Sequence, residues 1–162
     1  MVFITHLRPA RPSDCVAIFQ AHYYAVRLAC LQSYDAIIRH EWLALLNENS
    51  YLRDMNQPNI ALWVAEYHGA VMGFFQLDLL RAHLSAVYVH PAVHKQGIGT
   101  ALLQRAEQLT LDSGASALSL YCPNNALAFF RLNGYQTLSE AFLPLNQDVK
   151  VPCRLMRKYL DK

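Results

Sequence analysis

A strand-like run that passes through a glycine loop directly into a helix constrains this chain more than any other feature. Residues 88–91 read Tyr-Val-His-Pro, Gly97-Ile98-Gly99 follows, and a helical pattern begins at once. Glycine lets the chain turn sharply and lets a ligand approach the main chain. The free N–H groups and the dipole of a helix N-terminus favour an anion. The segment indicates a phosphate-binding turn, although a bare Gly-x-Gly also serves as a packing turn.

The helix after the loop has one apolar face. The apolar side chains that recur at helical spacing are Ile98, Ala101, Leu102, Ala106 and Leu109. Ser113-Gly114 supplies a stop signal. We therefore predict an amphipathic helix over residues 98–112.

Two common nucleotide loops are excluded. A Walker A loop needs Gly-x-x-x-x-Gly-Lys followed by Ser or Thr, and the chain contains no such string. A dinucleotide fingerprint needs a third glycine three residues after Gly99, where the chain has Leu102.

The loop resembles the acetyl-CoA-binding motif of the GNAT acetyltransferases. That motif is a strand with a Val-x-Pro exit, followed by Gln/Arg-x-x-Gly-x-Gly/Ala at the start of a helix. Val89, Pro91 and the string His94-Lys95-Gln96-Gly97-Ile98-Gly99 fill it. The departure is His94, which stands where the family has Gln or Arg.

A second segment is similar to another motif of the same family. Residues 123–135 follow the strand-like run 118–122 and resemble the helix Asn-x-x-Ala-x-x-x-Tyr-x-x-x-Gly-Phe. Pro123 replaces the usual Asn, and Phe130 replaces the usual Tyr. The spacing still predicts a helix, but two polar side chains of the motif are replaced by apolar ones.

The order of elements predicts a single α/β domain over residues 1–162. We expect strands at 4–8, 60–67, 71–80, 84–89, 118–122, 136–145 and 149–159, and helices at 12–30, 35–46, 98–112 and after 123. His68-Gly69-Ala70 marks a hairpin, and the polar residues 47–59 are expected to connect helices to sheet. The order resembles the GNAT fold, a mixed, mostly antiparallel sheet of about six or seven strands flanked by about four helices.

Composition excludes several classes of protein. With 54% hydrophobic and 16% charged residues, the chain is not intrinsically disordered. It has no apolar run of membrane-span length and no signal-type N-terminus, so we expect a cytoplasmic protein without a membrane partner. A net charge of +2 without a basic run gives no support for nucleic-acid binding.

Metal binding is not expected either. The four cysteines are widely spaced and are predicted to be reduced, buried thiols. His90 and His94 have a helical metal-ligand spacing, but Pro91 between them favours a loop.

The resemblance implies transfer of an acetyl group from acetyl-CoA, as co-substrate, to a primary amine in a ternary complex. Main-chain atoms of the strand before the loop would bind the pantetheine arm, and the loop amides would bind the pyrophosphate. Carried over to this chain, the binding residues are Val87, Tyr88, Val89, Lys95, Gln96, Gly97, Ile98, Gly99, Thr100 and Asn125. Lys95, Arg105 or Arg131 could add positive charge, or could be solvated surface residues.

The transfer needs a base for the ammonium group and an acid for the departing thiolate. The family glutamate that acts as base lies six residues before the strand-end valine, and this position holds His83. Glu66 on the neighbouring strand is the other candidate base. Because the family tyrosine is missing at Phe130, Tyr121 or Tyr135 could act as the acid, or both could be core aromatics.

The acceptor side is open to three interpretations. Aromatic side chains of the N-terminal helices could line a pocket for a small amine or could belong to the core: His22, Tyr23, Tyr24, Tyr34 and Trp42. The acceptor is then a small-molecule or peptide amine. A protein N-terminal acetyltransferase and a non-catalytic acyl-CoA-binding module are the alternatives, the latter because of Pro123 and Phe130. The sequence leaves a homodimer and a monomer both open.

Overall fold

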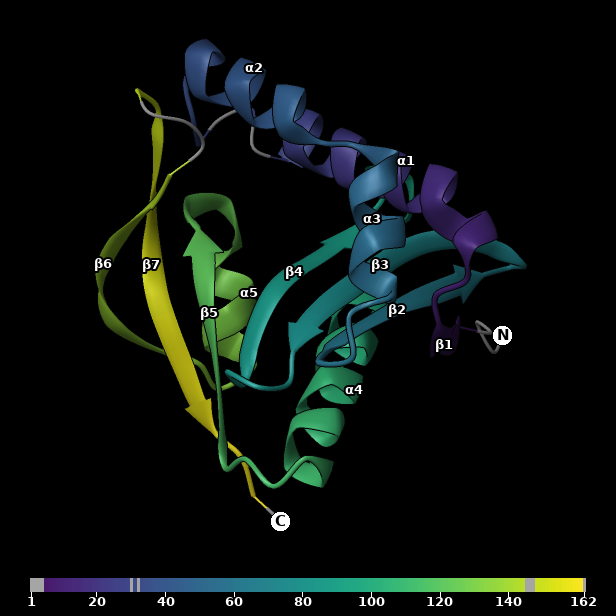
Figure 1. Ribbon diagram of the computed structural model, residues 1–162. Helices are drawn as coiled ribbons and strands as arrows, with labels where there is room; N and C mark the ends of the chain where they lie inside the picture. The colour runs from purple at the N-terminus through teal and green to yellow at the C-terminus, as the bar shows by residue number, and fades with distance from the viewer. Residues whose placement is uncertain (1–4, 30, 32, 145–147, 162) are drawn as a thin grey trace.

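The computed structural model describes residues 5–29, 31, 33–144 and 148–161 and shows one seven-stranded sheet flanked by helices (Figure 1). The strand order is β1-β2-β3-β4-β5-β7-β6. The strands are β1 (Thr5–Pro9), β2 (Ile60–Tyr67), β3 (Ala70–Asp78), β4 (His83–Val89), β5 (Ala117–Pro123), β6 (Gln136–Pro144) and β7 (Lys150–Tyr159). Each lies within two residues of its predicted position where described. The predicted α/β fold with a mixed, mostly antiparallel sheet is confirmed.

The described part of the chain forms five α-helices: α1 (Cys15–Tyr24), α2 (Ala36–Leu45), α3 (Glu48–Met55), α4 (Ile98–Asp112) and α5 (Leu127–Leu132). The first predicted helix, residues 12–30, is divided into a 3-10 turn (Pro12–Asp14), α1 and a π-helical stretch (Ala25–Ala29), and residue 30 lies outside the described residues.

Helix α3 corrects the sequence prediction, which treated residues 47–59 as a connection. The Asn47 side chain accepts a hydrogen bond from the Asn49 N–H (2.7 Å) and caps the helix. Tyr51 is buried against the sheet and is the helix's only buried residue. Five of its eight residues are charged or polar: Glu48, Asn49, Ser50, Arg53 and Asp54. The composition of this short segment therefore indicates a connection and not a helix.

The sheet separates two apolar layers (Figure 1). Helix α4 packs on one face, where Leu102, Leu103 and Ala106 are fully buried with Phe75 and Leu77 of β3. Helices α1 and α3 cover the other face, where Ile18 and Tyr51 pack on strand side chains such as Phe74. The alternation of Phe74 and Phe75 to opposite faces follows the two-residue period of a strand.

The predicted hairpin joins β2 to β3. His68 (φ +52°) and Gly69 (φ +83°) both lie in the left-handed region. Two successive left-handed residues are typical of the tight turn whose twist matches that of the flanking strands.

Strands β4 and β5 form the sheet's parallel pair and stay together over a short distance. Their register joins only His83 with Ser119 and Leu84 with Leu120. Next along β4, Ser85 is left out of the register with β3, which passes from Leu84–Leu77 to Ala86–Gln76. An extra residue of this kind bends a strand. The two strands diverge beyond this bulge (Figure 1).

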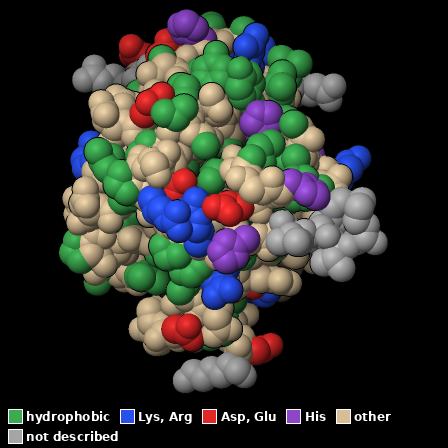
Figure 2. All heavy atoms as spheres, turned by 90° about the vertical axis from the view of Figure 1, so that its right-hand side faces the viewer, with side chains coloured by type: hydrophobic (Ala, Val, Ile, Leu, Met, Phe, Trp, Pro, Cys, Tyr) green, Lys and Arg blue, Asp and Glu red, His purple; other side chains and the backbone are tan. Residues whose placement is uncertain are grey.

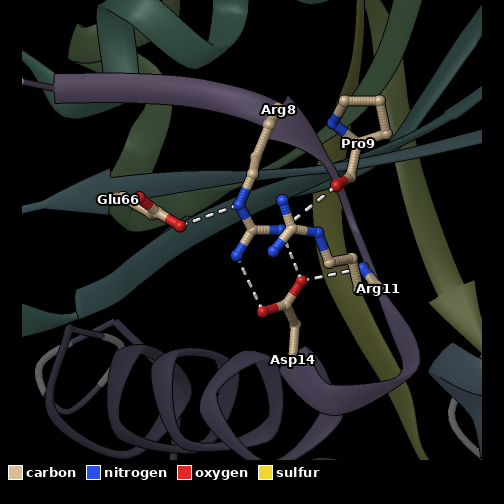
Figure 3. A network of polar contacts seen from close by, with 5 residues as sticks. All are labelled: Arg8, Pro9, Arg11, Asp14 and Glu66. Atoms are coloured by element: carbon tan, nitrogen blue, oxygen red, sulfur yellow. Dashed lines mark hydrogen bonds and ion pairs between the residues drawn. The ribbon is translucent and has the colours of Figure 1, made fainter. Parts of the chain in front are cut away.

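A network of ion pairs ties the N-terminal strand to the sheet and to α1 (Figure 3). The Arg8 Nη1 donates to Asp14 Oδ2 (2.7 Å), and its Nε donates to Glu66 Oε1 (2.7 Å). The hydrogen bond from Arg8 is the main cause that holds the pKa of Asp14 below its usual range. On the face shown in Figure 2, basic and acidic side chains are interspersed.

No helix among the described residues is long and apolar enough to span a membrane. Cys15, Cys122 and Cys153 are free and buried, as expected, while Cys30 lies outside the described residues.

Candidate active site

The glycine loop forms a left-handed turn at the N-terminus of α4. Gly97 is the residue before the helix and has φ +80°, and no atom lies within 4 Å of the position that a Cβ would occupy. The first hydrogen bond of the helix joins the Ala101 N–H to the Gly97 carbonyl (3.0 Å). The amides that precede Ala101 therefore have no partner within the helix and are directed out of its end.

A cavity of about 550 Å³ begins at these amides and follows β4. Of the predicted binding residues, it is lined by Val87, Tyr88, Val89, Lys95, Gly97, Ile98, Gly99, Thr100 and Asn125. Gln96 is exposed and does not line it. Because β4 and β5 diverge, main-chain groups of β4 face this space and not a neighbouring strand. We call this space the donor cavity.

Sequence reasoning missed several residues of the donor cavity, including Ala25, Val93 and Phe129. The Phe129 ring lies 3.4 Å from the position of a Cβ on Gly99, an ordinary contact distance, so packing does not by itself require a glycine there. Gly97, with φ +80°, is the glycine that the turn requires. The spacing of the two glycines in the sequence did not show this difference.

The other basic residues considered for the coenzyme lie outside the donor cavity lining. Arg105 is placed over the ring of Trp63, 5.2 Å from its centroid. Arg131 is exposed on α5. Lys95 alone of the three lines the cavity.

A second cavity of about 240 Å³ meets the donor cavity where β4 and β5 separate. The two cavities share four lining residues: Ser85, Tyr88, Tyr121 and Pro123. The second cavity is otherwise lined by His83, Trp42, Leu143, Val151 and Cys153. We call it the acceptor cavity. Two spaces with a common wall can hold two reactants side by side.

His83 lies in the acceptor cavity wall at the start of β4. Its Nδ1 is 2.9 Å from the Ser119 hydroxyl of β5, and its ring meets the Tyr121 ring at 5.1 Å between centroids. Burial lowers the pKa of His83 below its usual value. With the Nδ1–H donated to Ser119, the neutral ring keeps the lone pair of Nε2 for a proton.

The other candidate acid and base residues occupy different places. Tyr121 lines both cavities, is 43% exposed, and its hydroxyl makes no hydrogen bond to a described residue. Tyr135 donates its hydroxyl to Glu107 (2.8 Å) and lines neither cavity. Glu66 lies in the Arg8 network and also lines neither cavity.

The N-terminal aromatics divide between wall and core. Trp42 lines the acceptor cavity. Tyr34 packs on Trp42, donates its hydroxyl to the Pro152 carbonyl (2.8 Å) and accepts the Asn124 N–H (2.9 Å). His22 lies 4.3 Å from the Tyr88 ring between centroids, and burial lowers its pKa to about 3. Four of these aromatic residues line neither cavity: His22, Tyr23, Tyr24 and Tyr34.

The described residues contain no group of three or more His, Cys, Asp or Glu side chains that could hold a metal ion. His90 accepts the Ala92 N–H through Nδ1 (3.0 Å) and so serves as a local cap.

A family model described as the acetyltransferase (GNAT) family matches residues 22–135, which include the donor cavity's glycine loop and α5. The chain belongs to the GNAT acetyltransferase family. A search of curated proteins gives no match.

Solved GNAT structures share the fold over the full length. A GCN5-related N-acetyltransferase from Rhodopseudomonas palustris has a TM-score of 0.89 at 23% identity, covering 99% of each chain. PaiA N-acetyltransferase from Thermoplasma acidophilum, in complex with coenzyme A, has a TM-score of 0.80 at 17% identity, covering 96% of this chain and 99% of its own. A ribosomal-protein-alanine N-acetyltransferase from Brucella melitensis has a TM-score of 0.72 at 20% identity over 96% and 99%.

The departures from the GNAT motifs have visible structural consequences. His94 lines the donor cavity and donates from Nε2 to the Val89 carbonyl (3.1 Å), so it ties the loop to the end of β4. Phe130 is buried between Phe129 and Tyr135 and presents a ring without a hydroxyl to the donor cavity. Phe130 therefore offers no hydroxyl at the position where the family motif has a tyrosine.

Proposed function

We propose that this chain transfers an acetyl group from acetyl-CoA to a primary amine by direct attack in a ternary complex. The observation that carries the proposal is the common wall of the two cavities at Ser85, Tyr88, Tyr121 and Pro123. One cavity leads to the amides of a helix N-terminus, and the other contains His83 as a neutral histidine.

The donor cavity fits coenzyme A. The amides at the start of α4 and the positive end of its dipole suit a pyrophosphate, and Lys95 adds a charge. The empty space around Gly97 allows a phosphate to approach the main chain. Along β4, main-chain groups of Val87 to Val89 would bind the amides of the pantetheine arm. Acetyl-CoA would supply the acetyl group as a thioester, and coenzyme A would leave as a thiol.

His83 is the proposed base. An alkyl ammonium with a pKa near 10.4 costs about 4 to 5 kcal/mol to deprotonate at pH 7. The Nε2 of neutral His83 accepts that proton, while Ser119 holds the ring through Nδ1. Because Glu66 is engaged by Arg8 outside both cavities, the geometry favours His83 of the two.

Tyr121 is the proposed proton donor to the thiolate. It stands at the common wall, and its hydroxyl is available to a ligand. A thiol pKa near 8.5 makes the thiolate a tolerable leaving group, so this contribution is small.

Release of free thiol from acetyl-CoA, measured across a panel of amines and peptides, tests the function. The proposal predicts amine-dependent thiol release with formation of the acetylated amine. Binding of acetyl-CoA with no release for any acceptor would favour the non-catalytic module, which Phe130 supports by its missing hydroxyl. Release confined to peptides with free N-termini would favour the N-terminal acetyltransferase. A cytoplasmic location stays a prediction, and so does the choice between monomer and homodimer.

A further inference from the structure

The acceptor cavity is assembled from apolar side chains of distant segments. Its walls come from Trp42 of α2, Tyr121 of β5, Leu143 of β6, and Val151 and Cys153 of β7. Trp42, Val151 and Cys153 are buried. Burial raises the pKa of the Cys153 thiol, so this residue adds no charge at neutral pH.

The described residues that line this cavity carry no fixed charge. None of the described residues that line it is Asp, Glu, Lys or Arg. The residues outside the described ranges also include no Asp or Glu in the sequence. The lining residues that carry polar side-chain groups are His83, Ser85, Tyr88, Tyr121 and, through its indole N–H, Trp42.

The cavity walls are braced before any ligand binds. The Tyr34 hydroxyl bridges the Pro152 carbonyl of β7 and the Asn124 N–H that follows β5. The Tyr34 ring in turn meets the Trp42 ring at 5.9 Å between centroids in an edge-to-face contact. Trp42 is therefore buried against a tyrosine whose hydroxyl is itself hydrogen-bonded at the ends of two strands, and this contact exists without a ligand.

An uncharged wall discriminates among amines. A second ammonium group, as in a polyamine, would lose its hydration without gaining a counter-charge, and so would the carboxylate of an amino acid. A peptide acceptor would bury several backbone amides in a mostly apolar space where few lining side chains can donate or accept a hydrogen bond. An amine on an aryl or alkyl body incurs none of these losses, and a space of about 240 Å³ limits its size.

We propose that the acceptor is a small monoamine carried on an aryl or alkyl body, bound against Trp42, Leu143 and Val151. The inference rests on the proposed function and names its substrate class. In the transfer, the ammonium first gives one proton to His83 Nε2, and the amine nitrogen then forms the C–N bond as the C–S bond breaks. The second nitrogen proton reaches the thiolate through Tyr121 or water, which is thereby reprotonated, and His83 releases its proton to solvent.

The first test is a comparison of kcat/KM by thiol release from acetyl-CoA. We expect 2-phenylethylamine and hexylamine to exceed spermidine, L-lysine and a peptide with a free N-terminal alanine by at least about 10-fold. If one of the last three equals or exceeds the monoamines, the substrate class is wrong while the transferase function stands. If no acceptor releases thiol, the proposed function fails and takes the inference with it.

The second test places a charge in the acceptor cavity. Leu143→Glu should lower kcat/KM for 2-phenylethylamine by at least about 10-fold and leave the Kd of acetyl-CoA within about 2-fold. Leu138→Glu is the matched control, since Leu138 is 46% exposed on the same strand and lines neither cavity. It should change neither constant.

Unchanged kcat/KM in Leu143→Glu would overturn the inference. Retained affinity for acetyl-CoA shows that the variant is folded. If the glutamate prevents folding, Leu143→Trp fills the cavity without a charge and should produce the same selective loss. Full activity toward 2-phenylethylamine in Leu143→Trp would also overturn the inference.

Discussion

The donor and acceptor cavities meet at the same wall but are built in opposite ways. The donor cavity is formed mainly by two continuous stretches, the β4 to α4 segment and the β5 to α5 segment. The acceptor cavity collects one to three residues from each of α2, β4, β5, β6 and β7. Under the proposed function, the donor cavity would bind its ligand largely through main-chain groups and the acceptor cavity through side chains. A main-chain site of this kind leaves a readable sequence motif, and a side-chain site assembled from distant strands does not.

The largest expected effect is on the donor side. Gly97→Asp should weaken acetyl-CoA binding by about 100-fold, roughly 3 kcal/mol, because it puts a carboxylate and a Cβ where the pyrophosphate approaches. Calorimetric titration measures the change. Gly69→Asp is a matched control with nearly the same backbone conformation (φ +83° against +80°) and no atom near its Cβ position.

Both aspartates place a non-glycine residue in the left-handed region, so both should cost a similar amount of stability. Only the one at residue 97 should affect the coenzyme. Equal acetyl-CoA affinity in the two variants would contradict the donor assignment.

The next effect concerns the point where the cavities meet. His83→Gln should lower kcat by about 100-fold, because the proton acceptor is lost. In the wild type, burial places the pKa of His83 below 6.5, and only the neutral ring accepts a proton. We therefore expect kcat at saturating amine to be level above pH 6.5 and to fall as the pH drops through that lowered pKa.

Glu66→Gln is the comparison variant for this profile. It should keep the low-pH fall in kcat, since Glu66 is engaged by Arg8 away from both cavities. A low-pH fall that disappears in Glu66→Gln and persists in His83→Gln would reverse the assignment of the base.

A smaller effect is expected for Ser119, which sequence reasoning did not select. Ser119 contacts neither proposed substrate and acts by holding Nδ1 of His83 at 2.9 Å. Ser119→Ala should lower kcat by about 10-fold with little change in the KM of acetyl-CoA. Ser119→Thr keeps the hydroxyl and should restore the rate. If both variants match the wild type in kcat, Ser119 does not position His83.

The smallest effect on turnover is expected at the ion pair between Arg8 and Asp14, which line neither cavity. Asp14→Asn removes a charge-assisted pair with Arg8 and should cost about 2 kcal/mol of unfolding free energy while kcat stays near the wild-type value. Because the pKa of Asp14 is lowered, its contribution is present above pH 3.8 and is lost as the pH falls through the lowered pKa.

Denaturant unfolding at several pH values measures this difference. Glu140→Gln, at an exposed carboxylate, is the control and should change stability little. An Asp14→Asn variant as stable as Glu140→Gln would show that the network contributes nothing measurable.

The sequence predicts the fold and the donor cavity well because both rest on local patterns. Strand alternation, the His68-Gly69 turn and the glycine loop each lie within a short segment. Gln96 shows the limit, since the motif includes it but the loop, with Lys95 at φ +64°, leaves its side chain outside the cavity. Helix α3 was missed because it is short and five of its eight residues are charged or polar, a composition typical of a connection.

The acceptor cavity could not be read from the sequence because long-range register creates it. The pairing of Pro123 with Cys153 brings β7 to the site, and the bulge at Ser85 opens the sheet. His83 and Glu66 were both candidate bases in the sequence. Arg8, more than fifty residues before Glu66, binds the Glu66 carboxylate, and no local pattern predicts that contact.

A structure with a bisubstrate analogue, coenzyme A joined through an acetyl bridge to 2-phenylethylamine, tests the central claim most directly. We predict the pyrophosphate at the amides of Gly97 to Thr100 and the phenyl ring in the acceptor cavity against Trp42 and Val151, with the bridge between Tyr88 and Tyr121. A pyrophosphate bound away from α4, or a phenyl ring outside the acceptor cavity, would contradict the account.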